Sequence, residues 1–285
     1  MRRLYFGYGS NLDEADFHAY VGARGHERAA LVGGIPAFLP DHAPAYRYRS
    51  DAREGGALDV RPEPGAVTPG ALFEIDEATL HALDDKEGVA SRCYERVDVT
   101  VLDLEGREHH AFTYRVCRER LTDYMPPIEG YVRVVARGLA RFGLPDTWHA
   151  RAARNEAVEP LPVFVYGTLR RGEVAAHRLS ASREVEEARV RGRLLHLGGY
   201  PGLVEGEGWV KGELHRFERL HGVLSELDEY EDFRGYGARQ NLYRRVIAEA
   251  HAEARRELAW VYRFLGDPAP YPVIHGGDWR EARRA

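Results

Sequence analysis

One short phrase occurs twice in this 285-residue chain, and it constrains the fold more than any other feature. Residues 4–12 read LYFGYGSNL, and residues 163–172 read VFVYGTLRRG. In each copy an apolar run typical of a β-strand ends in Tyr-Gly-(Ser/Thr), and a polar or basic turn follows. The tyrosines of the two copies, Tyr8 and Tyr166, are 158 positions apart (166 minus 8). A repeat at this spacing predicts two related domains and not one large domain.

The likeness between the halves continues beyond this phrase. Each half has a second strand-like run that leads into a leucine-rich, acidic helical segment, at 70–89 and at 212–233. Each half then has two further alternating strands, the first beginning with Tyr-x-Arg-Val and the second ending in Tyr-Arg. The tyrosines of these strands are Tyr94 and Tyr114 in the first half, and Tyr243 and Tyr262 in the second. This order predicts an α+β fold in which sheet dominates.

The junction between the halves lies at 145–162. A helical, arginine-rich run at 134–142 ends at a glycine and a proline, and two further prolines precede the second phrase. The chain is long enough for two domains that each bury a core. We predict domains at 1–150 and 161–285, the first of which has an additional helix at its end.

Composition excludes several classes of function. The formal net charge of -5 gives no reason to expect nucleic acid as a partner. No apolar stretch approaches the roughly 18 residues of a membrane span, and residues 1–30 lack the apolar core of a signal peptide. The two cysteines, Cys93 and Cys117, lack the CxxC spacing of a zinc site, and HExxH is missing. We expect a cytoplasmic protein without metal or cofactor and with neither nucleic acid nor membrane as partner; its oligomeric state stays open.

Two glutamates stand where a carboxylate could carry out chemistry. Leu83 and Glu87 are four residues apart on a short helix, and Leu227 and Glu231 repeat this spacing. Each carboxylate therefore shares a helix face with a buried leucine. Burial raises the pKa of a carboxyl group and suits it to proton transfer. An alternative, which periodicity alone does not exclude, is that both acidic segments are solvated helix ends.

The Tyr-Gly loops are candidates for contact with a ligand. Glycine after a strand lets backbone N–H groups approach a bound molecule closely. In the alternative interpretation the loops are ordinary strand ends, with Ser10 and Thr168 as helix N-caps. Neither a phosphate-binding P-loop nor a Gly-x-Ser-x-Gly nucleophile elbow is present.

The pairing of each loop with a distant glutamate resembles the γ-glutamylcyclotransferase superfamily, which includes the AIG2-like proteins. That family has a Tyr-Gly-Ser-Asn-Leu or Tyr-Gly-Thr-Leu loop after its first strand and a Leu-Asp-x-x-Glu-Gly stretch later. The resemblance implies two tandem γ-glutamylcyclotransferase-like domains, each a small mixed β-barrel or sheet flanked by short helices, with the second domain AIG2-like. It is carried by residues 5–12 and 83–89 in the first half, and by 164–172, 198–204, 224–233 and 276–279 in the second.

The resemblance also implies an activity and its residues. Members of the family expel an amine from a γ-glutamyl amide and close the glutamyl part into 5-oxoproline, without metal or cofactor. The partner would be a small-molecule γ-glutamyl substrate, with Glu87 and Glu231 as the catalytic acid–base groups. The hydroxyls of four tyrosines could hold the substrate's α-carboxylate, and plain aromatic packing is the alternative for them. The implied substrate-binding residues are Tyr8, Gly9, Ser10, Asn11, Leu12, Tyr94, Tyr114, Tyr166, Gly167, Thr168, Leu169, Tyr243 and Tyr262.

The two halves do not match the family pattern equally. Glu87 is followed by Gly88, whereas Glu231 is followed by Asp232, an acid in place of a glycine that allows close approach. We therefore expect the first half to be catalytic, and the second to be either a second active site or a divergent binding domain. Two alternatives remain: an enzyme of this kind dedicated to one larger amine, and a non-catalytic tandem small-molecule-binding protein of the same fold.

Overall fold

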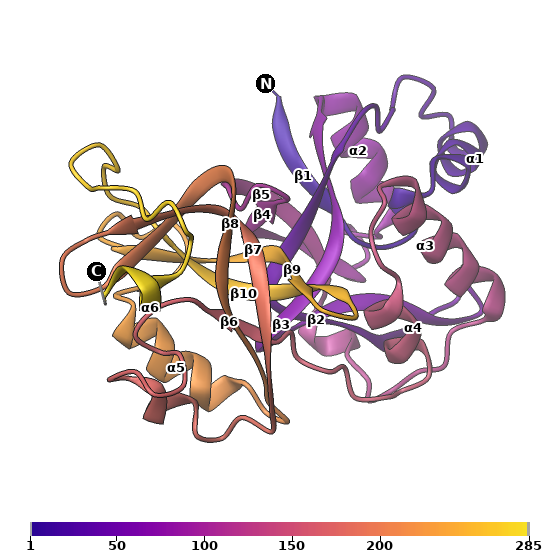
Figure 1. Ribbon diagram of the computed structural model, residues 1–285. Helices are drawn as coiled ribbons and strands as arrows, with labels where there is room; N and C mark the ends of the chain where they lie inside the picture. The colour runs from indigo at the N-terminus through magenta and orange to yellow at the C-terminus, as the bar shows by residue number, and fades with distance from the viewer. Residues whose placement is uncertain (1, 284–285) are drawn as a thin grey trace. The chain divides into compact units, whose positions relative to one another are not determined.

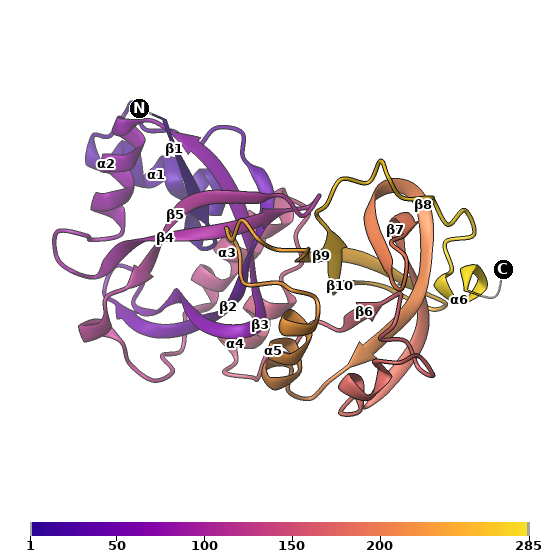
Figure 2. The same ribbon diagram turned by 90° about the vertical axis from the view of Figure 1, so that its left-hand side faces the viewer.

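The computed structural model describes residues 2–283, which form two compact units. Unit 1 comprises Met1–Glu159 and unit 2 comprises Pro160–Ala285, and we describe each by itself (Figures 1 and 2). In each unit five strands close into a barrel, with short helices outside the sheet. This confirms the predicted α+β fold of two tandem mixed barrels. Within residues 2–283, no helix has the length and apolar character needed to cross a membrane.

The barrel of unit 1 has the strand order β1–β3–β2–β4–β5. Neighbouring strands are antiparallel, except that β1 and β5 pair in parallel, with Tyr5 opposite Phe112, and so close the barrel. Side chains alternate between the two faces of the sheet, so Phe6 lies on one face and Phe73, which is paired with Tyr5, lies on the other; both are fully buried. The strands are β1 (Arg3–Gly7), β2 (Ile35–Ser50), β3 (Gly55–Ile75), β4 (Tyr94–Asp103) and β5 (Glu108–Val116).

The helices of unit 1 support the loop that follows β1. That loop forms a short 3-10 turn, and helix α3 packs directly against it, because a side chain at Gly138 would collide with Leu12. The predicted helix at 134–142 is confirmed and begins earlier, at Glu129. The helices are η1 (Ser10–Leu12), α1 (Glu14–Arg24), α2 (Glu77–Lys86), η2 (Arg118–Arg120), α3 (Glu129–Arg141) and α4 (Thr147–Ala153).

Unit 2 repeats the same connectivity. Its barrel order is β10–β6–β8–β7–β9, and β10 and β6 pair in parallel with Trp260 opposite Val163. Helix α5 occupies the place in the chain that α2 has in unit 1, between the third and fourth strands of its barrel. The elements are β6 (Val163–Val165), η3 (Ala176–Leu179), β7 (Glu184–His196), β8 (Pro201–Arg216), α5 (His221–Tyr230), β9 (Tyr243–Ala252), β10 (Arg256–Phe264) and α6 (Trp279–Ala282).

Candidate active site

Each glutamate is the residue that ends the helix between the third and fourth strands. The N–H of Glu87 donates to the carbonyl of Leu83 over 2.8 Å, and the N–H of Glu231 donates to the carbonyl of Leu227 over 2.9 Å. Both leucines are fully buried, as the spacing predicted. Both glutamates are half-buried, so neither belongs to a fully solvated helix end.

The residue after each glutamate has left-handed backbone geometry. Gly88 has φ of 64° and Asp232 has φ of 49°. Aspartate enters this region more readily than most residues with a side chain. The two helices therefore end in the same way, and the change from glycine to Asp232 does not disrupt the backbone that presents Glu231.

In unit 1 the glutamate is held by the loop after β1. The side-chain amide of Asn11 donates to Oε1 of Glu87 over 2.8 Å and to the hydroxyl of Tyr5 over 2.9 Å. Burial raises the pKa of Glu87, while the neighbouring charge of Lys86 and the hydrogen bond from Asn11 oppose that rise. The structure thus joins the two sequence motifs of the first half in one hydrogen bond.

An ionic cluster adjoins this glutamate. Arg53 donates through both terminal nitrogens to Asp16, over 2.8 and 2.7 Å, and also to the hydroxyl of Ser10 over 3.0 Å. Lys86 donates to the same Asp16 over 2.8 Å. Burial would raise the pKa of Asp16, but the hydrogen bonds and charges of Arg53 and Lys86 lower it to about 2. The surroundings of Glu87 are therefore strongly polar.

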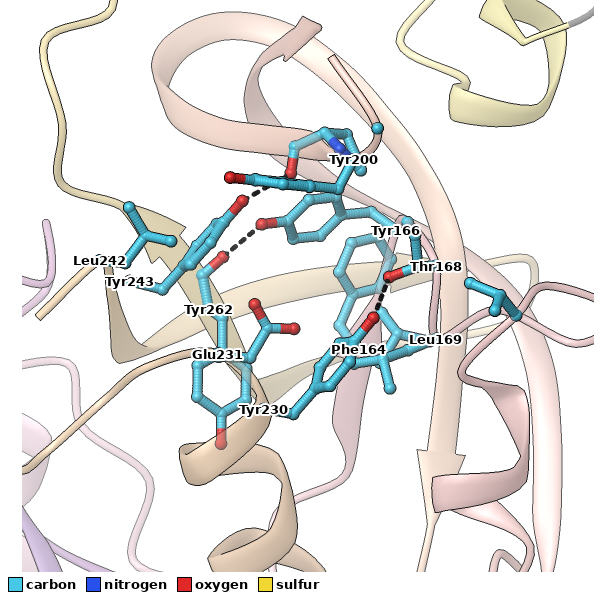
Figure 3. Close-up of a pocket in the computed structure, with 15 residues that line it drawn as sticks. Phe164, Tyr166, Thr168, Leu169, Tyr200, Tyr230, Glu231, Leu242, Tyr243 and Tyr262 are labelled. Carbon is cyan, nitrogen blue, oxygen red and sulfur yellow. Dashed lines mark hydrogen bonds between the residues drawn. The ribbon is translucent and has the colours of Figure 1, made fainter. Parts of the chain in front are cut away.

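In unit 2 the carboxylate of Glu231 points into a cavity of about 380 Å³ (Figure 3). Tyr262 and Tyr230 lie on either side of it in that view. Among residues 2–283, no side chain donates a hydrogen bond to this carboxylate or forms an ion pair with it. Burial alone raises the pKa of Glu231 to about 8.

The Tyr-Gly-Thr loop forms one wall of this cavity through Gly167, Thr168 and Leu169. A Cβ atom on Gly167 would lie 2.6 Å from the ring of Pro201, so only glycine permits this approach. The backbone N–H groups of these three residues have no acceptor within the described chain. The hydroxyl of Thr168 is 2.9 Å from that of Tyr230. The loop therefore offers free backbone donors on the same cavity as the unpaired carboxylate.

The tyrosine hydroxyls that we predicted to hold substrate already donate to acceptors in the protein. Because each hydroxyl proton is already in a hydrogen bond, these tyrosines can contact a ligand in this conformation only through the ring or as acceptors. Their role in binding the α-carboxylate stays a prediction. The donations are from Tyr8 to the carbonyl of Tyr114, Tyr94 to that of Leu58, Tyr166 to that of Tyr262, Tyr243 to that of Pro201, and from Tyr114 and Tyr262 to the carboxylates of Asp84 and Asp228.

Several residues near the glutamates were not singled out in the sequence. Arg53 comes from the turn between β2 and β3, and Tyr131 on α3 packs under its guanidinium group, 5.0 Å away. In unit 2, Tyr200, Tyr230 and Leu242 line the cavity (Figure 3). Arg53, Tyr131 and Leu242 lie outside the motifs of the sequence analysis. Tyr200 and Tyr230 lie within segments 198–204 and 224–233, which carry the resemblance, but nothing in those segments marked them as site residues. In the described part of the chain, no group of three or more His, Cys, Asp or Glu residues could hold a metal ion.

Each barrel holds a half-buried glutamate beside a glycine loop. Comparisons with known protein families match both halves of the chain. Residues 163–281 match the family described as gamma-glutamyl cyclotransferase, AIG2-like, and residues 69–151 match the AIG2-like family. The human gamma-glutamylcyclotransferase is 30% identical over 161 residues, which cover 55% of this chain and 79% of the human protein. The chain belongs to the gamma-glutamylcyclotransferase family.

Other relatives show the same likeness. The gamma-L-glutamyl-butirosin B gamma-glutamyl cyclotransferase of Niallia circulans is 32% identical over 123 residues, covering 42% of this chain and 76% of that protein. A solved structure titled gamma-glutamyl cyclotransferase is 27% identical, covers 56% of this chain and 89% of its own, and has a TM-score of 0.43.

Proposed function

We propose that this protein is a γ-glutamyl cyclotransferase that releases an amine or amino acid and 5-oxoproline from a γ-glutamyl amide, without a metal. The observation that carries the proposal is the unpaired carboxylate of Glu231 in a cavity whose wall includes the Tyr-Gly-Thr loop. The family match supports it from an independent direction. The two free cysteines, Cys93 and Cys117, support a cytoplasmic location as part of the same proposal, because reducing compartments keep thiols free.

In the proposed reaction the substrate's α-amine attacks its own γ-carbonyl carbon. A carbon–nitrogen bond forms in the five-membered ring, and the bond to the leaving amine breaks. The glutamate takes the proton from the α-amine and returns it to the leaving nitrogen, so no water is consumed. A carboxylate with a pKa of about 8 is close in basicity to an α-amino group, which makes the proton transfer nearly balanced.

The remaining assistance would come from the loop and from proximity. The attack places negative charge on the carbonyl oxygen, and the free N–H groups of Gly167, Thr168 and Leu169 are suitable donors to it. Holding the amine against the carbonyl converts the reaction into a positioned intramolecular step. In unit 1 the loop containing Asn11 and the carboxylate of Glu87 would have the corresponding roles.

The test replaces the two glutamates separately and together. We expect Glu87→Gln and Glu231→Gln each to abolish the contribution of its own unit, and the double variant to lose 5-oxoproline release by about 10²–10⁴-fold, the usual worth of a general base. Release is measured from a panel of γ-glutamyl amides and amino acids. Full turnover by the folded double variant would refute the proposal. Binding of the panel by the wild-type protein without any turnover would instead support the non-catalytic alternative.

A further inference from the structure

The mouth of the Glu231 cavity carries exposed apolar side chains. Four of the lining residues, which we call the rim, expose large fractions of their surface: Val174 (77%), Tyr200 (44%), Tyr230 (38%) and Leu242 (36%). Among the described residues that line the cavity, Glu231 is the only Asp, Glu, Lys, Arg or His. A single exposed apolar residue needs no explanation, but several gathered around one cavity mark a ligand site.

The rim is assembled from four separate segments. Val174 follows the Tyr-Gly-Thr loop, Tyr200 precedes β8, Tyr230 ends α5, and Leu242 directly precedes β9. Figure 3 shows Tyr200, Leu242 and Tyr230 at different sides of the Glu231 carboxylate. The segment that carries Leu242 runs from 231 to 242, whereas the corresponding segment of unit 1 runs only from 87 to 93. The longer segment thus supplies part of the rim.

We propose that the rim is the subsite for the leaving amine and that unit 2 acts on γ-glutamyl amides whose amine carries an aromatic or branched apolar group. This inference rests on the proposed function. Cyclisation fixes the glutamyl part beside Glu231, so the amine must extend from the reacting carbonyl toward the mouth. The cavity, at about 380 Å³, is near the small end of ligand sites, which span about 300–1,000 Å³.

The chemistry of the rim selects an apolar amine. Two exposed tyrosine rings, Tyr200 and Tyr230, offer faces for an aromatic group, and Leu242 and Val174 offer aliphatic surface. The guanidinium of Arg178 lies 4.7 Å from the centre of the Tyr230 ring and so covers part of that ring. Glu87 in unit 1 has Asp16, Arg53 and Lys86 around it instead, so we do not expect unit 1 to share this preference.

The experiment uses the full chain with Glu87→Gln, so that only unit 2 turns over substrate. It compares γ-glutamyl 2-phenylethylamide with γ-glutamyl ethylamide, whose leaving amines differ by one phenyl ring. We expect kcat/KM to be about tenfold or more higher for the phenylethylamide. The difference should appear mainly in KM, because the rim binds a part of the substrate remote from the reacting bond. Tyr200→Ser and Leu242→Ser should each reduce the phenylethylamide advantage several-fold.

Matched controls come from exposed apolar residues of unit 1. Val32 is 76% exposed and matches Val174, and the exposed Leu104 matches Leu242. Val32→Ser and Leu104→Ser should leave the ratio of the two kcat/KM values unchanged, whereas Val174→Ser should lower it. Equal kcat/KM for both amides, or rim variants that lower both equally, would overturn the subsite. Absence of 5-oxoproline from both amides would overturn the proposed function itself, and the subsite with it.

Discussion

The side-chain amide of Asn11 donates a hydrogen bond to the carboxylate of Glu87 over 2.8 Å. The corresponding loop of unit 2 reads Tyr-Gly-Thr-Leu and lacks this asparagine, and among the described residues the carboxylate of Glu231 receives no such bond. One barrel fold therefore presents the same acid in two electrostatic settings. The two settings differ in the side-chain amide of Asn11 and in the ionic cluster of Asp16, Arg53 and Lys86, which adjoin Glu87 in unit 1.

Replacing Asn11 tests the setting of unit 1. Asn11→Ala, made together with Glu231→Gln, removes a donor that stabilises the charged form of Glu87. The pKa of Glu87 should therefore rise further, so that less of the base is deprotonated at pH 7 and the acid limb of kcat/KM moves to higher pH. Tyr5→Phe is the control, because it removes the other acceptor of Asn11 and keeps the bond to Glu87. Unchanged acid limbs in both variants would contradict the prediction.

The pH dependence of unit 2 follows from the raised pKa of Glu231. Below pH 8 most of the carboxyl groups hold a proton and cannot accept one, so turnover by the Glu87→Gln variant should rise with pH up to about 8 and then level off. The measurement is kcat/KM from pH 5 to pH 9.5 with a neutral γ-glutamyl amide. An acid limb near pH 4.5 would show that water or substrate reverses the effect of burial.

The duplication and the barrel strands could be predicted from the sequence because they depend on local patterns. Alternating apolar residues predict strands, and the four-residue spacing of Leu83 and Glu87 placed the carboxylate on the buried side of its helix. The consequence expected from Asp232 was harder to judge. Gly88 and Asp232 both adopt left-handed backbone geometry. The change of residue type suggested a different helix end, and only the structure showed that the two ends share one geometry.

The surroundings of the two glutamates could not be predicted from the sequence. Arg53 reaches Asp16 and Ser10 from a turn about 40 residues away along the chain, a contact that only the closed barrel creates. The rim of unit 2 likewise joins Val174, Tyr200 and Leu242 from loops that follow no periodic pattern. The electrostatic setting of each acid depends on such long-range contacts, and local motifs contain no information about them.

The burial of Glu231 also has a cost in stability. Its folded-state pKa is raised from 4.5 to about 8, so the folded state holds the proton more tightly than the unfolded chain. The free energy of unfolding contributed by this tighter proton binding is fully present below pH 4.5 and is lost as the pH rises through 8. Glu231→Gln, which is neutral at every pH, should therefore stabilise unit 2 by about 2–4 kcal/mol at pH 9 and change little at pH 4. Urea unfolding at both pH values measures this.

A control for that comparison lies on the same helix. Glu226 is an exposed residue of α5, so Glu226→Gln should change the free energy of unfolding little at either pH. An equal effect of the two variants at pH 9 would show that Glu231 is solvated in the folded protein, against the geometry of the cavity.

Contact between helix α3 and the loop after β1 can be tested at Gly138. A Cβ atom there would lie 2.4 Å from Cβ of Leu12 and 2.9 Å from the backbone nitrogen of Asp13, so Gly138→Ala must push α3 away from the loop that carries Asn11. We expect Gly138→Ala to lower the free energy of unfolding by about 1–3 kcal/mol, because the site becomes overpacked. Unit 1 turnover should fall in the Glu231→Gln background, whereas unit 2 turnover should persist in the Glu87→Gln background.

Gly22 gives the matched substitution, because it is an exposed helical glycine of α1 with no neighbour within 4 Å of an added Cβ. Both changes bring the same gain in helix propensity, about 0.5–1 kcal/mol, so their difference isolates the collision with Leu12. Gly22→Ala should therefore unfold at a higher urea concentration than the parent protein, and Gly138→Ala at a lower one. If the two variants are equally stable, α3 can move without cost, and the position of Asn11 beside Glu87 does not depend on this packing.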